Sequence, residues 1–295
     1  MSNLFYLLAI SFIIISFTFV VVLPKFLFSK EGLELSYKYL VPRYLIFSAI
    51  FSLIGAFILS RSLYLPIDLI PFAALEGLIY TVAAYLVFYA LSKEKAMIIG
   101  IINSSQMLLI SFFSALLFSQ KLLFRSSIII LIMLVGVFLI SIQNSGHRSK
   151  FSWLTLVALL GNLLWVLMWL IFDSTITKNS NLSFIYFGIL MTFSALFGII
   201  FSRIKKVEDR SEIFNKDKKD WFMVEIIVLL GLFNGIGTVL FSFAYVISPV
   251  LTPLLTELMV VGIVLLSFIW LKERLSSLQT FGIITICLAL ILFLI

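Results

Sequence analysis

The chain has 295 residues, of which 62% are hydrophobic and 12% charged, and its mean hydropathy is +1.21. A soluble domain carries about twice that share of charge, so the composition excludes an ordinary soluble enzyme. The formal net charge is +7, but the basic residues are spread over short loops, which argues against a nucleic-acid partner. The single cysteine, Cys287, excludes a disulfide framework and a thiolate metal cluster. We therefore expect no metal and no cofactor.

Apolar runs recur along the chain with the length, about 17 to 25 residues, that spans about 30 Å of hydrocarbon as a helix. The first run has no basic residue before it and no small-residue cleavage site, so we interpret it as a retained helix and not as a signal peptide. The sequence predicts an all-α polytopic membrane protein with ten transmembrane helices, near residues 4–23, 41–60, 69–91, 96–118, 127–143, 152–172, 183–202, 222–246, 250–271 and 277–295.

The positive charges predict how these helices are oriented. Of the 21 Lys and Arg residues, 17 lie in the loops after the first, third, fifth, seventh and ninth runs. The opposite side holds only Arg61, Lys121, Arg125 and Lys178. Because Lys and Arg near the ends of spans remain on the cytoplasmic side, we expect a multi-pass protein of the plasma membrane with both termini outside.

The two halves of the chain share a weak internal repeat. Tyr44, Phe51 and Ser52 match Tyr186, Phe193 and Ser194 at a shift of 142, and Gly77 matches Gly231 at a shift of 154. Each copy contains five predicted spans, an odd number, so the second copy enters the membrane in the opposite orientation. We therefore predict two inverted five-helix repeats, at residues 1–146 and 147–295. Gly231 and Gly235 form a small-xxx-small pair, which we expect to serve packing within the protomer.

Short motifs recur in both halves. The first half carries Tyr85–Leu91 and Gly136-Val137, and the second carries Phe243-Ala244-Tyr245, Ser248-Pro249 and Leu271–Ser276. These motifs resemble the EamA domain of the drug/metabolite transporter superfamily. One departure is Gln120, which stands where the first repeat of this family usually has a glutamate. The resemblance implies an EamA-like domain in each half and an alternating-access carrier with a central cavity.

Polar side chains at mid-membrane depth are costly and therefore need partners or a purpose. Glu257 lies about 5 Å from the predicted midplane, and the shift of 154 places Asn103 opposite it. We predict that a substrate binds among Tyr80, Asn103, Gln106, Asn162, Trp165, Asn234 and Glu257. For each of these groups the alternative is a structural hydrogen bond between helices.

Glu257 and Glu76 are proton-coupling candidates, because a carboxyl at membrane depth can load and release a proton during a transport cycle. Pro249, Pro253 and Glu257 recur at four-residue intervals along one face, and each proline removes a backbone hydrogen bond one turn earlier. We expect Pro249 and Pro253 to act as a hinge, with a static kink as the alternative.

These features favour a secondary, alternating-access transporter that exchanges a small organic solute, such as an amino acid, a metabolite or a drug, across the plasma membrane. We expect export, with proton coupling through Glu257 left open, and a monomer or weak homodimer in the bilayer. No nucleotide-binding motif supplies ATP energy. The alternatives are a flippase for lipid-linked substrates with the same fold and an intramembrane enzyme. The enzyme ranks lower, because the only histidine, His147, lies in a loop and no cluster of nucleophiles or bases accompanies it.

Overall fold

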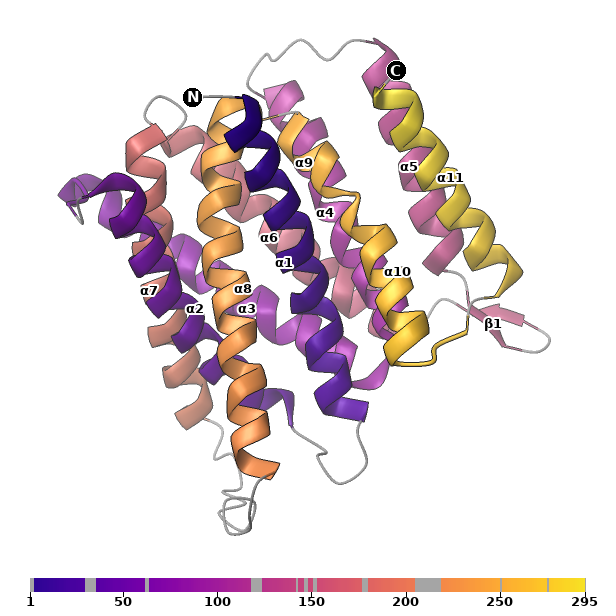
Figure 1. Ribbon diagram of the computed structural model, residues 1–295, viewed down its shortest axis with the longest axis horizontal. Helices are drawn as coiled ribbons and strands as arrows, with labels where there is room; N and C mark the ends of the chain where they lie inside the picture. Colours follow the sequence, from indigo (N-terminus) through magenta and orange to yellow (C-terminus); the bar gives the residue numbers. More distant parts are fainter. Residues whose placement is uncertain are drawn as a thin grey trace.

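The apolar runs form helices, because a backbone away from water satisfies its N–H and C=O groups within a helix. In the computed structural model these helices form one bundle, and α1 begins at the same end of the bundle at which α11 ends (Figure 1). The structure describes residues 3–29, 36–61, 64–117, 124–141, 143–145, 148–150, 153–176, 180–204, 219–249, 251–274 and 276–294. Gln120, His147 and the predicted repeat boundary at 146–147 lie outside these ranges.

The first half of the chain holds five α-helices and a short 3-10 helix: α1 (Asn3–Ser29), α2 (Tyr37–Ser60), η1 (Ile67–Leu69), α3 (Ile70–Lys93), α4 (Ala96–Leu117) and α5 (Phe124–Ser141). A two-stranded antiparallel hairpin, β1 (Gln143–Ser145) and β2 (Arg148–Lys150), follows. The second half holds α6 (Trp153–Ile176), α7 (Ser180–Ile204), α8 (Lys219–Ile247), α9 (Leu251–Thr256), α10 (Met259–Trp270) and α11 (Ser277–Leu294).

The helices lie at the predicted ranges, and seven spans of the described residues are long and apolar enough to cross a membrane. Several predicted boundaries are wrong: α1 continues past residue 23 to Ser29, and α2 begins at Tyr37 instead of residue 41. The sixth helix continues past residue 172 to Ile176 and buries Asp173 completely. The predicted ninth helix is two helices, α9 and α10, separated by a turn at Glu257 and Leu258. There the backbone N–H groups of Leu258, Val260 and Val261 bond three residues back, which tightens the helix locally.

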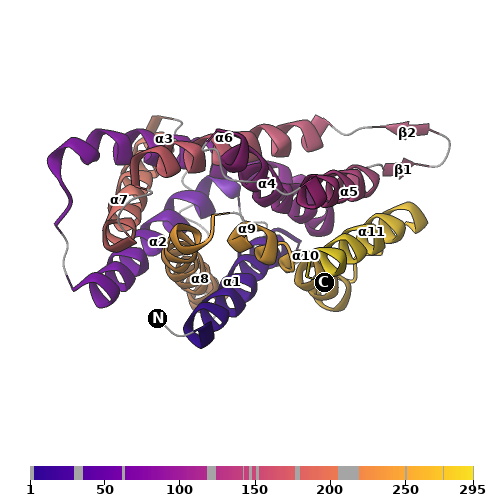
Figure 2. The same ribbon diagram turned by 90° about the horizontal axis from the view of Figure 1, so that it is seen from above.

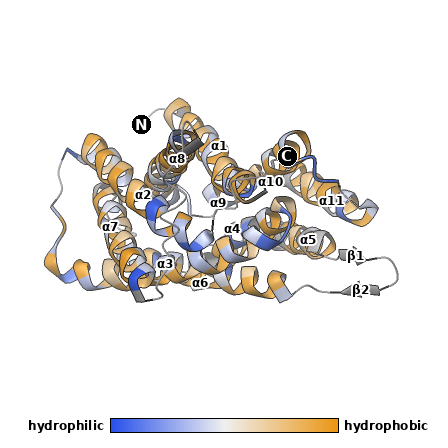
Figure 3. Cartoon of the chain, turned by 90° about the horizontal axis from the view of Figure 1, so that it is seen from below, coloured by the Kyte–Doolittle hydropathy of each residue, from blue (hydrophilic) through white to orange (hydrophobic). Residues whose placement is uncertain are grey.

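The helices pack in pairs that cross between the two halves. Helix α2 packs against α7 and α8, α3 against α6 and α7, α1 against α8 and α10, and α4 against α6, α9 and α10. Helices α5 and α11 pack against each other at one side of the bundle, as Figures 1 and 2 show. The helices carry mostly hydrophobic residues on their outer faces (Figure 3), where Leu131, Phe138, Leu160 and Phe281 are more than half exposed. Such a surface suits hydrocarbon and not water.

Glycines permit the closest helix contacts. A Cβ on Gly231 would lie 2.2 Å from Cβ of Phe47, and a Cβ on Gly235 would lie 2.6 Å from the carbonyl oxygen of Ser48. The predicted small-xxx-small pair therefore joins α8 to α2 within the protomer. Gly77 does the same between α3 and α7, because its Cβ would lie 2.8 Å from the carbonyl oxygen of Leu190.

One end of the bundle is closed by a contact between the halves. The Glu273 carboxylate, in the segment between α10 and α11, accepts hydrogen bonds from the backbone N–H groups of Ala96 (2.9 Å) and Met97 (3.1 Å). These are the first residues of α4, whose N–H groups have no partner within the helix. Lys95 Nζ donates to the carbonyl oxygen of Arg274 at 3.3 Å. The second half thus caps a helix of the first.

Candidate functional site

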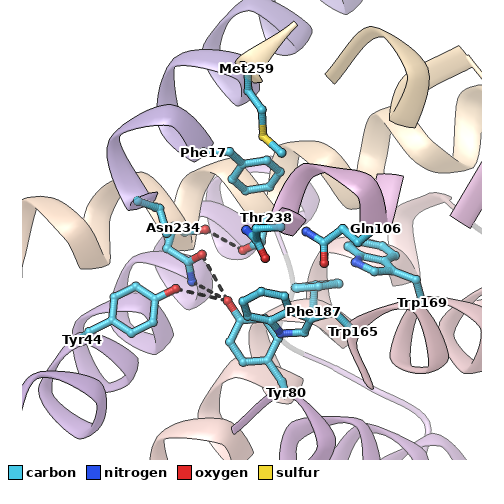
Figure 4. A pocket seen from close by; sticks show the side chains of 12 residues that line it. Phe17, Tyr44, Tyr80, Gln106, Trp165, Trp169, Phe187, Asn234, Thr238 and Met259 are labelled. Carbon is cyan, nitrogen blue, oxygen red and sulfur yellow. Dashed lines mark hydrogen bonds between the residues drawn. The ribbon is translucent and has the colours of Figure 1, made fainter. Parts of the chain in front are cut away.

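A pocket lies between the two halves, with a volume of about 50 Å³. Eight helices line it, and each half of the chain supplies six residues. The first half contributes Phe17, Val20, Tyr44, Tyr80, Asn103 and Gln106, and the second contributes Trp165, Trp169, Phe187, Asn234, Thr238 and Met259 (Figure 4). A cavity of this size holds a few water molecules, whereas pockets for organic ligands measure about 300 to 1,000 Å³. The pocket as it stands is smaller than such ligand pockets.

Hydrogen bonds hold one wall of the pocket together. Tyr80 Oη lies 3.1 Å from Oδ1 and 3.0 Å from Nδ2 of Asn234, so it can donate to the first atom and accept from the second (Figure 4). Tyr44 Oη lies 3.3 Å from Tyr80 Oη, and Asn234 Nδ2 donates to Ser48 Oγ at 3.2 Å. All four residues are buried. Helices α2, α3 and α8 are therefore joined through uncharged groups.

Aromatic rings form most of the remaining wall. The rings of Tyr80 and Trp165 lie 5.7 Å apart between centroids, and Trp169 stacks on Phe187 at 5.0 Å. Trp169 also contacts Phe241 edge to face at 4.7 Å behind the pocket. Six of the twelve lining residues are aromatic, and none is Asp, Glu, Lys, Arg or His. The pocket offers ring faces and uncharged polar groups.

Three polar atoms of the lining residues have no hydrogen-bond partner among the described residues. They are Asn103 Oδ1, Gln106 Oε1 and Trp165 Nε1, and all three are buried. Asn103 and Gln106 share a face of α4, and Trp165 comes from α6, which packs against α4. Buried polar atoms normally have partners. Two acceptors and one donor are thus available to a bound molecule.

Five of the seven residues predicted to bind substrate line this pocket: Tyr80, Asn103, Gln106, Trp165 and Asn234. Asn162 does not, because its side-chain amide donates to the carbonyl oxygen of Ile102 and joins α6 to α4. Glu257 does not line the pocket either, although it is fully buried and Met259, two residues later, does. Of the predicted pair Asn103 and Glu257, only Asn103 lines this pocket.

The other predicted residues lie near the pocket but outside its wall. Glu76 is fully buried, and its Oε1 accepts a hydrogen bond from the hydroxyl of Tyr186 on α7, while Oε2 has no partner among the described residues. Pro249 lies between α8 and α9, and Pro253 is buried within α9. The helix breaks at Glu257, whose N–H is shared by the carbonyl oxygens of Pro253 and Leu254, both at 3.2 Å.

Sequence reasoning missed seven lining residues: Phe17, Val20, Tyr44, Trp169, Phe187, Thr238 and Met259. Two of them had a usable signal. Thr238 follows Asn234 by four residues and so shares its helix face, and Tyr44 belongs to the internal repeat. The others are apolar or aromatic residues in apolar runs, where no pattern separates a cavity wall from a lipid contact. In the described part of the chain, no three His, Cys, Asp or Glu residues gather as metal ligands.

Known proteins resemble this chain in fold and, over its second half, in sequence. A solved crystal structure matches 99% of this chain and 97% of its own, with a TM-score of 0.62 and 16% sequence identity, and this likeness concerns the fold alone. The comparison with curated proteins gave no match. The family model described as the EamA-like transporter family matches residues 152–295. This match confirms the predicted resemblance for the second half of the chain, and the family belongs to the drug/metabolite transporter superfamily.

Proposed function

We propose that this protein is a secondary transporter that moves a small organic solute across the plasma membrane by alternating access. The pocket between the halves is the observation that carries this proposal. Each half supplies six of its residues, from its first four predicted spans, and Glu273 ties the halves together at one end. Rocking of the two halves about a shared site would expose that site to each side in turn.

We also propose that the fold is a ten-span inverted repeat, with halves at 1–146 and 147–295. The pattern of helix contacts supports this. In such a repeat α1 corresponds to α6, α2 to α7, α3 to α8, α4 to the α9–α10 pair, and α5 to α11. The contact between α2 and α8 then corresponds to that between α7 and α3, and the contact between α3 and α6 to that between α8 and α1. All four of these helix pairs are in contact. The pairs α2–α7 and α5–α11 each correspond to themselves. The shared end for the two termini agrees with an even number of crossings (Figure 1).

The glycine contacts support a similar symmetry and refine its register. Gly77 meets Leu190, Phe193 and Ser194, while Gly235 meets Ser48, Phe51 and Ser52, which lie 142 residues earlier. In this packing Gly77 corresponds to Gly235, a shift of 158. The shift of 154 predicted from the sequence is therefore one helical turn too short, because apolar residues one turn apart are interchangeable in a sequence match.

Uptake and counterflow in proteoliposomes test the transport proposal. Purified protein should accelerate the exchange of at least one solute in a panel of amino acids, nucleobases, sugars and organic cations, relative to protein-free liposomes. Trp165→Ala removes a wall of the pocket and should reduce that exchange strongly, whereas Trp153→Ala, at a 71% exposed position, should not. Exchange of no solute in the panel would contradict the proposal.

Proton coupling through Glu257 has a separate test. The exchange measured in wild-type protein at two pH values is compared with that of Glu257→Gln and of Glu76→Gln. The matched control is Glu225→Gln, because Glu225 is exposed on α8. We expect Glu257→Gln to lose the response to an imposed pH gradient while solute counterflow persists. Normal transport with an unaltered response would rule out Glu257.

The orientation of the chain can be measured with single cysteines. Replacing Cys287 with serine gives a background without thiols. A cysteine at Ser276, between α10 and α11, should be labelled by a membrane-impermeant reagent only from the cytoplasmic side. A cysteine at Tyr64, between α2 and α3, should be labelled only from outside. The reverse labelling would invert the proposed topology, and labelling of both sites from one side would contradict the inverted repeat.

A further inference from the structure

The pocket has a chemistry of its own that narrows the kind of solute it can take. Its lining combines six aromatic rings with the amides of Asn103, Gln106 and Asn234, and it contains no acidic or basic residue. Asn234 is already bonded to Tyr80 and Ser48. The buried polar atoms of the lining that have no partner among the described residues are the two amide oxygens of α4 and the indole N–H of Trp165.

Charge is the first criterion. A zwitterionic amino acid would bring an ammonium and a carboxylate into a wall without a counter-charge, and burial of an unpaired charge is costly. The nearest acids do not offset this cost, because neither Glu76 nor Glu257 lines the pocket and Glu76 already accepts the Tyr186 hydroxyl. An uncharged solute avoids the penalty altogether.

Hydrogen-bond polarity is the second criterion. Asn103 Oδ1 and Gln106 Oε1 require donors, and Trp165 Nε1 requires an acceptor. An organic cation could face the aromatic rings, but a quaternary ammonium offers neither an N–H donor to the amide oxygens nor an acceptor to the indole. A hydrocarbon or a simple aromatic ring would leave all three atoms unsatisfied, which costs about 1 to 3 kcal/mol for each.

Shape is the third criterion. Gln106 and Trp165 lie on opposite sides of the same space, with the rings of Tyr80 and Phe187 beside it (Figure 4). Ring faces bind planar molecules by stacking, and polar atoms at the rim bind the edge of such a molecule. The volume of about 50 Å³ means that entry requires the opening motion included in the proposed function.

We infer that the pocket binds an uncharged planar heterocycle that carries both N–H donors and a carbonyl acceptor, the chemistry of a nucleobase. This inference rests on the proposed transport function and specifies its substrate class. Uracil is the smallest suitable probe, because its ring is neutral at pH 7 and offers two N–H donors and two carbonyl oxygens. Hypoxanthine is a larger, two-ring probe with two N–H donors and one carbonyl oxygen.

Equilibrium binding and counterflow of radiolabelled uracil and hypoxanthine test the inference in the full-length protein. The matched ligand control is 1,3-dimethyluracil, which keeps the ring and the carbonyl groups but lacks both N–H donors. We expect at least one of the two probes to bind and exchange, and dimethyluracil to compete with it at least about 10-fold more weakly. Phenylalanine and tetramethylammonium, which represent the zwitterion and the cation, should not compete.

Two variants locate the site. Trp165→Phe keeps a ring but removes the indole N–H, and Gln106→Leu removes the amide, so each should weaken binding of the probe by about 5- to 10-fold. Trp153→Phe is the control, because Trp153 is 71% exposed at the start of α6. Size-exclusion profiles identify any variant that fails to fold. If Gln106→Leu fails to fold, the binding measured for Trp165→Phe, the milder change, tests the assignment to this pocket.

The outcomes separate this inference from the transport proposal. Exchange of phenylalanine or of the cation, without binding of either heterocycle, would overturn the substrate class and leave the carrier intact. Probe binding that is unaffected by both variants would overturn the assignment to this pocket. Absence of exchange for every solute, together with absence of heterocycle binding, would overturn both.

Discussion

Two buried tyrosines on helices that pack against each other perform different tasks. Tyr44 of α2 reaches the hydroxyl of Tyr80 and, through it, Asn234, and all three line the pocket. Tyr186 of α7 donates to the carboxyl of Glu76, and neither lines the pocket. The shift of 158 places Glu76 at the position in its half that Asn234 occupies in the other. A tyrosine hydroxyl thus stabilises the uncharged pocket wall at Tyr44 and a buried acid in the helix packing at Tyr186.

The acid therefore lies apart from the uncharged pocket wall. Within the helix packing, Glu76 accepts one hydrogen bond from the described residues, that of the Tyr186 hydroxyl. The amide at Asn234, by contrast, is bonded on both sides. We therefore expect the acid pair to be sensitive to loss of one partner and the amide cluster to be more tolerant.

The largest loss of stability is expected when the hydrogen bond between Tyr186 and Glu76 is removed. Tyr186→Phe removes the donor to Glu76 Oε1 and leaves a buried carboxyl without that bond, so it should lower the stability by about 2 to 3 kcal/mol. The midpoint of SDS-induced unfolding measures the loss. In a Glu76→Gln background the same substitution should cost only about 0.6 kcal/mol, typical of a neutral interhelical bond. Equal costs in both backgrounds would mean that the pair does not act as described.

The next largest effect is expected when the amide of Asn234 is replaced by an acid. Asn234→Asp keeps the shape of the side chain but replaces the N–H donor to Ser48 with an oxygen and places an acid in the pocket wall. We expect binding of an uncharged solute to weaken by about 2 kcal/mol, or about 30-fold. Competition binding measures the change, and Asn234→Gln controls for altered packing. Undiminished affinity in Asn234→Asp would show that the wall does not depend on neutrality.

A smaller effect is expected at the close helix contacts made by Gly77 and Gly235. Alanine at Gly77 or Gly235 brings a Cβ to 2.8 Å or 2.6 Å from a backbone oxygen, so each substitution should destabilise the protein by about 1 to 2 kcal/mol. Gly55→Ala is the matched control, since its nearest neighbour would lie 3.9 Å away. Thermal unfolding in detergent compares the three. A large loss at only one of the first two positions would argue against equivalent packing in the two halves.

The smallest effect concerns the tolerant cluster. Tyr44→Phe removes one hydroxyl at 3.3 Å from Tyr80, and Tyr80 keeps its bonds to Asn234. We expect a loss of about 0.6 kcal/mol, which the SDS midpoint resolves when it is compared with Tyr186→Phe in the same assay. If Tyr44→Phe costs as much as Tyr186→Phe, the contrast between the two tyrosines is wrong.

The sequence singled out five residues of the pocket wall and none of its aliphatic ones. Asn234, Gln106 and Tyr80 stand out because a polar group in a long apolar run requires a partner. Phe17 and Met259 do not stand out, because an apolar side chain is equally at home against lipid and against a cavity. The predicted sixth span ended at residue 172, whereas α6 continues to Ile176 and buries Asp173.

The membrane setting and the approximate helices follow from the sequence, since hydrocarbon thickness and the cost of unpaired polar groups act on each segment alone. The EamA resemblance follows from short motifs. Which polar residues share a space depends on how the helices pack. In the folded chain, Glu257 and Asn162 lie outside the pocket wall, Glu76 pairs with Tyr186, and Gly77 and Gly235, 158 residues apart, make matching contacts. The physical reason is that a helix rotated by one turn buries nearly the same apolar surface, so close packing alone distinguishes the registers.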